Sequence, residues 1–229
     1  MEFDYSVLHD NFTYLLWGRV AEGEPGGVLL TVIMALSSGA IALVLGVIMA
    51  AIAWRFTGWP RRILFLWAAF IRGIPLIFVI FWLYFLLPVV FGAAIPATLT
   101  VIAALAWFTS AAVMHSTLAG LEALPKGQTE AGIASGFSQI KIICFILLPQ
   151  AWPNLLPSWL GLFISLIKDT SLAFIVNVPE LTTLAGQVNN RVQIYPAEIF
   201  LFIGLVYYFL CAALARFTAL KLTKKSPAN

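Results

Sequence analysis

Polar side chains that interrupt long apolar runs are the first residues whose chemistry needs an explanation. Arg72 stands inside one such run and His115 inside the next. A polar tetrad follows a later run and consists of Lys168, Asp169, Thr170 and Ser171. A cation, a carboxylate and two hydroxyls can bind the charged ends of a zwitterionic solute. If the apolar runs cross a membrane, ionisable residues within them are costly and usually belong to a path for a solute or ion.

Each of these residues also has a structural interpretation. Arg72 precedes Pro75, whose missing N–H frees a carbonyl that the guanidinium could contact instead of a solute. Lys168 and Asp169 could pair with each other or with a neighbouring helix. A lone histidine on an apolar helix is often a packed core residue, although His115 could also relay protons.

The composition places the chain in a membrane. Of its 229 residues, 62% are hydrophobic and 10% are charged, and the mean hydropathy is +0.97. A soluble domain has about 25% charged residues. The net charge of +3 does not indicate nucleic-acid binding, because most basic residues lie beside apolar runs. Cys144 and Cys211 have apolar neighbours and no CxxC spacing, so we expect buried hydrophobes rather than a disulfide or metal site.

Five segments are apolar over the roughly 20 residues that a membrane-spanning helix needs. They are Val28–Trp54, Ile63–Phe91, Pro96–Leu121, Pro149–Ile167 and Ala197–Leu220. The sequence therefore predicts an all-α, polytopic membrane protein with five transmembrane helices. Gly39 and Gly46 share one face of the first span, with Ala50 and Ala53 close to it, and we expect this face to pack closely on another helix.

The basic residues predict the orientation of these spans. The connections after the first and third spans and the end of the chain are basic, with Arg55, Arg61, Arg62, Lys126, Lys141, Arg216, Lys221, Lys224 and Lys225. The charged residues within 1–27 are mostly acidic instead. The positive-inside rule then puts the N-terminus outside and the C-terminus inside. We expect a periplasmic segment (1–27), a transmembrane domain (28–222) and a cytoplasmic tail (223–229).

The long cytoplasmic loop, about residues 122–149, has a regular pattern. Thr129 could cap a helix whose first turn holds Glu130. Gly136 permits a bend, and Ser138 can cap a second helix. Pro149 suits the first turn of the fourth span. The pattern predicts a helix, a bend and a helix, which could dock into a groove of another protein or rest on lipid headgroups.

This loop resembles the EAA motif of ATP-binding-cassette importer permeases. Glu130-Ala131, then Gly136, then Ile146-x-Leu148-Pro149 stand at the motif's spacing. Gly132 replaces the second Ala and should weaken the first helix by about 1 kcal/mol. Further matches are Arg72–Leu76, Leu124–Gln128 and Lys168–Leu172. Together they make nearly the whole chain similar to the polar amino acid permease family.

The resemblance implies a type I ABC importer permease fold in the bacterial inner membrane. Residues 129–149 would form the coupling helix that sits in a cleft of an ATPase. The coupling residues would be Glu130, Ala131, Gly136, Phe137, Leu148 and Pro149. The implied partners are a second permease, identical or related, a cytoplasmic ATPase dimer and a periplasmic amino-acid-binding protein. The chain has no GxxxxGK[ST] sequence, so the partner ATPase is expected to bind ATP and Mg²⁺, and no cofactor is expected in this chain.

The same resemblance implies that Arg72, His115 and residues 168–171 line the translocation path. His115 stands where many relatives carry Glu, and Leu118 where they usually carry Arg. The N-terminal EFDYS and the KDTSL segment are similar to glutamate/aspartate permease subunits. The expected substrate is therefore a polar, acidic amino acid, moved inward by alternating access.

Other readings of the sequence remain open. A stand-alone secondary transporter or channel would need its own coupling-ion site, and no inverted repeat is visible. A membrane enzyme would need catalytic residues, yet the sequence has no HExxH or paired carboxylates. The polar segment Val178–Tyr195 should face the periplasm, where it could meet the binding protein or remain a solvated loop.

Overall fold

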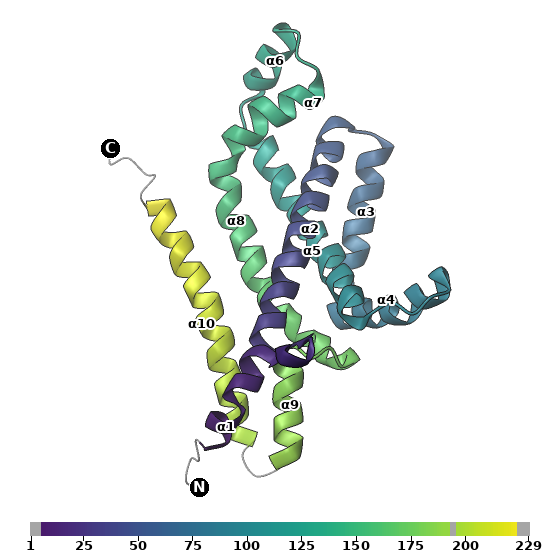
Figure 1. Ribbon diagram of the computed structural model, residues 1–229. Coiled ribbons are helices and arrows are strands. Elements are labelled where there is room, and N and C mark those ends of the chain that lie inside the picture. Colours follow the sequence, from purple (N-terminus) through teal and green to yellow (C-terminus); the bar gives the residue numbers. More distant parts are fainter. Residues whose placement is uncertain (1–5, 193–195, 224–229) are drawn as a thin grey trace.

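A computed structural model describes residues 6–192 and 196–223 of the chain. Its long helices run side by side between two ends of an elongated molecule (Figure 1). These are α2 (Gly27–Arg55), α5 (Ala97–Glu122), α8 (Leu148–Asp169) and α10 (Pro196–Thr223). The predicted first, third and fifth spans are confirmed, with ends within a few residues of those expected. Residues 224–229 of the expected tail lie outside the described residues.

Close packing of α2 depends on its small residues, as the sequence predicted. A β-carbon on Gly46 would stand 2.5 Å from the β-carbon of Val113 on α5. A β-carbon on Gly39 would stand 2.7 Å from the ring of Phe163 on α8. Ala50 and Ala53 are fully buried. Glycine is therefore required where α2 touches its neighbours, because apolar burial gives little drive for helix association inside a bilayer.

Gly46→Ala should lower thermal stability in detergent. The added methyl group would collide with Val113 and with the backbone oxygen of Ser110, 2.9 Å away, so the helices must separate. Overpacking of this kind costs about 1–3 kcal/mol. Gly161→Ala on α8 is the matched control, because nothing lies within 4 Å of its added carbon. Equal melting temperatures for the two variants would contradict the close contact of α2 and α5.

The predicted second span is not one helix. It divides into α3 (Trp59–Gly73) and α4 (Leu76–Phe91), which are bent by 102° at the break. Ile74 is extended (ψ 136°), as expected for the residue before a proline, and Pro75 begins the new helix. In Figure 1, α4 projects sideways from the bundle. Four described helices are long and apolar enough to span a membrane, and a fifth span exists only if the bent pair counts as one.

The predicted fourth span, about Pro149–Ile167, corresponds to α8, but α8 is part of a longer helical run. Helix α7 (Gln139–Ile142) continues through a π-helical turn, η2 (Ile143–Leu147), into α8. The whole helical run covers Gln139–Val176 because its last turns form the 3-10 helix η3 (Thr170–Val176). Pro149 cannot donate an N–H to the turn before it, which accounts for non-α hydrogen bonding at this position.

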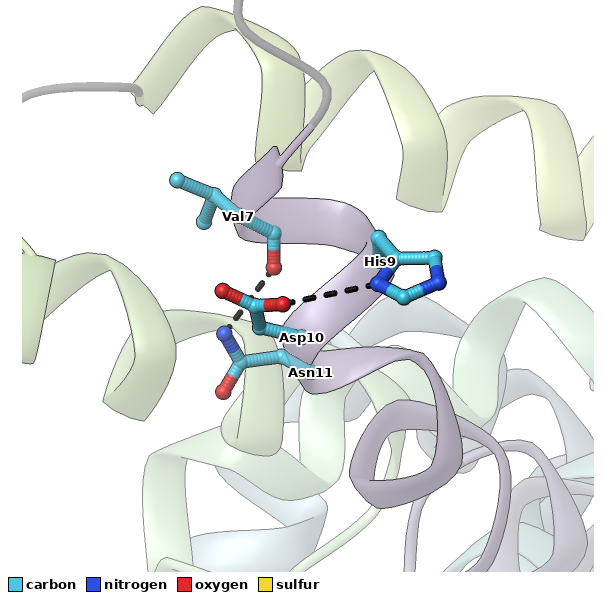
Figure 2. Close-up of polar contacts among 4 residues, drawn as sticks. All are labelled: Val7, His9, Asp10 and Asn11. Atoms are coloured by element: carbon cyan, nitrogen blue, oxygen red, sulfur yellow. Dashed lines mark hydrogen bonds and ion pairs between the residues drawn. The ribbon is translucent and has the colours of Figure 1, made fainter.

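The N-terminal segment folds over the end of the bundle opposite α7 (Figure 1). It contains α1 (Ser6–Trp17), β1 (Gly18–Arg19), a 3-10 turn η1 (Val20–Glu22) and β2 (Glu24–Pro25). A turn precedes the first span, with Gly23 at φ 82°. Figure 2 shows the polar contacts on α1: His9 Nδ1 lies 3.4 Å from an Asp10 oxygen, and Asn11 donates to the Val7 carbonyl. These contacts join near neighbours and do not assemble a site.

Two further expectations need correction. The described part of Val178–Tyr195 is not a solvated loop, because it forms α9 (Leu181–Val192), whose apolar face is buried in a cluster with α1 and α10. Residues 193–195 lie outside the described part. Cys144 is exposed rather than buried, while Cys211 is half-buried and contacts the Ile164 carbonyl at 3.8 Å. Both thiols are free.

Candidate functional site

The segment that carries the EAA-like motif begins with α6 (Lys126–Ala134). Pro125 supplies the extended residue before the helix, and its carbonyl accepts the Gln128 N–H at 3.0 Å. The helix thus begins three residues before Thr129, so Thr129 is not its cap. Proline is suited to start this helix because its fixed φ is compatible with a helix start.

Gly136 ends α6 in a left-handed turn. Its φ is 77°, its N–H donates to Ile133, and the next N–H, of Phe137, donates to the Gly132 carbonyl. This pair of bonds is a Schellman motif, which favours glycine at the left-handed position. The expected bend at Gly136 is therefore present, with a defined hydrogen-bond pattern.

Ser138 caps α7, as the sequence predicted, and accepts the Lys141 N–H at 3.5 Å. The α6–α7 segment, residues 126–142, projects at one end of the molecule (Figure 1). Most of its side chains are exposed. Of the six expected coupling residues, four are exposed on this segment: Glu130, Ala131, Gly136 and Phe137. The other two lie beyond it at the start of α8, where Pro149 is exposed and Leu148 is half-buried. Ile133 is also 55% exposed, so the segment presents apolar surface without cover in this chain.

Gly132 lets α6 lie against the following helix. It is buried, and a β-carbon there would stand 2.9 Å from Ile142 and 3.0 Å from Ile146. The sequence suggested only a weaker helix at this departure from the motif. The structure adds a packing reason: the absent methyl group gives room to two isoleucines. Ile142 itself is fully buried.

A cavity of about 510 Å³ lies between α6 and the ends of α2 and α5. Glu130, Lys126 and Glu122 contribute its charged lining. Glu122 accepts a hydrogen bond from Arg61 at 2.7 Å, and the Arg61 guanidinium lies 5.2 Å from the Phe65 ring centroid. This ion pair joins the start of α3 to the end of α5, directly beside the α6–α7 segment.

Arg72 and His115 come from neighbouring helices. Arg72 is exposed in the last turn of α3, where a cation favours the helix dipole. The His115 ring on α5 meets the Phe65 ring of α3 edge-on, with 5.0 Å between the ring centroids. The break after Arg72 places this cation at a free helix end.

The four polar residues at the α8–η3 junction have different surroundings. Lys168 is exposed, and Asp169 and Ser171 are half-buried. Thr170 is fully buried and donates to the Ile167 carbonyl, and Ser171 donates to the Lys168 carbonyl. Within the described residues, the ion pairs do not include one between Lys168 and Asp169. None of these four residues shares a helix with Arg72, which is on α3, or with His115, which is on α5.

Glu180 was not singled out by the sequence, yet it is fully buried. Its carboxylate accepts the N–H groups of Thr182 and Thr183, both at 2.8 Å, and the Tyr207 hydroxyl at 3.0 Å. It thereby caps α9 and ties it to α10. The Glu-Leu-Thr-Thr order is a local signal of a helix start. No local sequence signal indicates the contact with Tyr207. We call Glu180, Thr182, Thr183 and Tyr207 the α9 cap cluster.

Burial raises the pKa of the Glu180 carboxyl above its usual range, and the hydrogen bonds of the α9 cap cluster act against this shift. The folded chain then binds this proton up to a higher pH than the unfolded chain does. Stability should fall as pH rises from about 4.3 through the raised pKa, and then level off. Melting curves across this range should show the decline in wild type and not in Glu180→Gln. An identical decline in both would contradict this assignment.

Several apolar spans, a broken helix with a cation at its end and an exposed helical segment at one end define a class: a multi-pass membrane protein. The family described as "Binding-protein-dependent transport system inner membrane component" matches residues 42–222. The chain belongs to this family. It is a multi-pass inner-membrane protein.

Named relatives agree with this assignment. "Probable glutamine ABC transporter permease protein GlnP" of Bacillus subtilis is 33% identical over 184 residues, which are 80% of this chain and 84% of the relative. "Arginine transport system permease protein ArtQ" of the same organism is 30% identical over 189 residues, again 80% and 84%. The chain is a permease subunit of an amino-acid ABC importer, a class of subunit that is not itself an enzyme.

A solved structure has the same fold. It is described as "Crystal structure of an amino acid ABC transporter with histidines" and superposes with a TM-score of 0.80. The match covers 98% of this chain and 100% of the other, at 23% sequence identity. The overall arrangement of the helices is therefore supported by a whole-chain superposition.

Proposed function

We propose that this subunit moves an acidic amino acid into the cytoplasm and that its α6–α7 segment receives the force of ATP binding. The observation that carries the coupling proposal is the exposed helix pair joined by a left-handed turn at Gly136. Its apolar surface, with Phe137 and Ile133, is suited to a groove on a partner protein. Glu130 borders the cavity behind it. The partners are an ATPase dimer, a second permease and a periplasmic binding protein.

The proposed orientation puts the α6–α7 segment in the cytoplasm. Arg55, Arg61, Lys126 and Lys141 gather at that end, which the positive-inside rule assigns to the cytoplasm. The opposite end carries α1 and α9, and it would meet the binding protein. ATP binding would then bias the packed spans between inward-open and outward-open arrangements.

The substrate proposal rests on a different set of residues. Arg72 at the broken helix and Lys168 at the α8–η3 junction are exposed cations within or beside the spans. Cations there favour an anionic side chain or carboxylate. Asp169 and Ser171 would receive the amine, and His115 would contact the path beside Arg72. The fully buried Thr170 would support the path from behind. The printed names of the relatives mention glutamine and arginine, so this acidic preference needs its own test.

The test reconstitutes the chain with its partner permease, ATPase and binding protein in liposomes. The ATPase rate is recorded while the binding protein is loaded with one amino acid at a time. Glutamate or aspartate should stimulate the rate, whereas glutamine and arginine should not. Stimulation by glutamine or arginine alone would keep the coupling proposal and overturn the acidic substrate. An assembled complex that no amino acid stimulates would overturn both.

A further inference from the structure

Besides the cavity lined by Glu130, an apolar groove lies on the outer surface of the bundle, at the same end as the α6–α7 segment. It has a volume of about 320 Å³ and lies between the last turns of α2 and the α7–η2 stretch. One wall is Ile48 and Ile52 of α2, and the other is Ile140, Ile143 and Cys144. The groove is thus apolar on both sides and separate from the cavity that holds Glu130.

The side chains of this groove are left open to the surroundings. Ile140 is 73% exposed, Ile48 is 50% exposed and Ile52 is 37% exposed. The wall formed by α2 belongs to a helix that is long and apolar enough to span a membrane, so lipid can reach it. A groove of this size and composition fits part of an acyl chain.

One cationic side chain lines the groove, and a second is the chain neighbour of a residue that lines it. Arg55 is the only charged side chain among the described residues that line it, and its guanidinium carbon lies 4.9 Å from the Phe56 ring centroid. Lys141 is exposed one helical turn from Cys144. Arg61 is neutralised by Glu122, whereas the ion pairs of the described residues include no partner for Arg55 or Lys141. Both cations therefore remain free for an anion.

We propose that this groove binds an anionic phospholipid. One acyl chain lies between α2 and α7–η2, and the phosphate contacts Arg55 and Lys141. Basic pockets beside membrane helices bind anionic headgroups for the same electrostatic reason. The bound lipid would bridge the scaffold helix α2 and the helix that continues from the α6–α7 segment. The proposed lipid site requires only that the chain is inserted in a membrane. It does not depend on which amino acid is transported.

The test uses the full chain, purified in detergent and titrated with dioleoyl phosphatidylglycerol or dioleoyl phosphatidylcholine under native mass spectrometry. Phosphatidylglycerol should bind more tightly. Arg55→Gln should lower this preference about fivefold, the contribution of one cation near an anionic lipid. Arg216→Gln is the matched control, since Arg216 is an exposed cation near the end of another helix, α10. An equal loss in both variants would mean general surface charge and would overturn the site.

The alkylation rates of the two cysteines test whether an acyl chain occupies the groove. Cys144 lines the groove, and Cys211 is half-buried on α10. In nanodiscs, phosphatidylglycerol should slow alkylation of Cys144 and leave the rate at Cys211 unchanged. Ala51→Phe, which fills the groove from α2, should remove this lipid dependence; its elution on size exclusion checks the fold. Glycerol 3-phosphate, a headgroup without chains, should give no protection. Equal Cys144 rates in phosphatidylglycerol and phosphatidylcholine would overturn the proposal.

Discussion

Gly136→Val should reduce ATP-driven uptake about tenfold or more while leaving the protein folded. Gly136 holds φ 77°, and an L-residue pays about 1–2 kcal/mol there, more when branched at Cβ. Nothing lies within 4 Å of an added β-carbon, so the penalty is confined to the backbone. Valine would leave the left-handed region, break the two bonds to Ile133 and Gly132 and re-aim α6. About 1.4 kcal/mol changes a two-state population tenfold.

The measurement compares uptake and binding-protein-stimulated ATPase activity in proteoliposomes. Gly136→Asn is the matched control, because asparagine tolerates the left-handed conformation. It should retain most of the coupling. Size-exclusion elution and ATPase copurification show whether each variant assembles. Full uptake by an assembled Gly136→Val complex would mean that the turn is not part of force transmission.

Glu180→Ala should destabilise the protein strongly, by about 3 kcal/mol or more. Each buried donor left without a partner costs roughly 1–3 kcal/mol. The change would remove the acceptor for the N–H groups of Thr182 and Thr183 and for the Tyr207 hydroxyl. It would also open a cavity, because Glu180 is among the largest fully buried side chains. Helix α9 would lose its cap and its tie to α10.

Tyr207→Phe separates these contributions. It removes one donor and leaves the α9 cap intact, so its cost should be about 1.5–3 kcal/mol, the range for a hydrogen bond to a charged group. Combined with Glu180→Ala, it should add little, because the Tyr207 contact is already lost. Melting temperatures of the two single variants and the double variant in one detergent give the comparison. Additive losses would show that the α9 cap cluster does not act as a unit.

Much of the fold follows from sequence because a bilayer restricts the choices. Long apolar runs must form helices there, since every backbone N–H and C=O needs an internal partner. The spans at α2, α5 and α10 were therefore predicted within a few residues. The face with Gly39 and Gly46 was predicted for the same kind of reason. In the α6–α7 segment, the left-handed Gly136 and the cap at Ser138 are local features that residue type alone indicates.

The features that sequence did not predict depend on distant contacts. The 102° bend between α3 and α4 follows from Pro75, but its angle reflects what α4 packs against. The burial of Glu180 depends on Tyr207, 27 residues further along the chain. Cys144 is exposed where it lines the groove between α2 and the α7–η2 stretch. An apolar residue in a membrane protein can face lipid or protein, and composition does not separate the two.

The sequence predicts less about the candidate translocation path than about the α6–α7 segment. Arg72 and His115 were predicted from their cost inside apolar runs, and the structure places them on adjacent helices. Thr170 shares its sequence motif with Lys168 but is fully buried, since a 3-10 turn begins at Thr170. A change of helix type moves side chains to other faces. Residue spacing alone could not show this.

The π-helical turn at Ile143–Leu147 shifts the helical phase of everything on either side of it. A π turn accommodates one additional residue, and one residue corresponds to about 100° around an α-helix. A helical wheel drawn through Gln139–Asp169 would therefore assign the wrong face to one of its halves. This offset lets Cys144 face α2 while Leu155 and Trp159 pack in a cluster with Val113 of α5. Deleting one residue from the turn would restore a regular α-helix and rotate the α6–α7 segment relative to the whole transmembrane bundle.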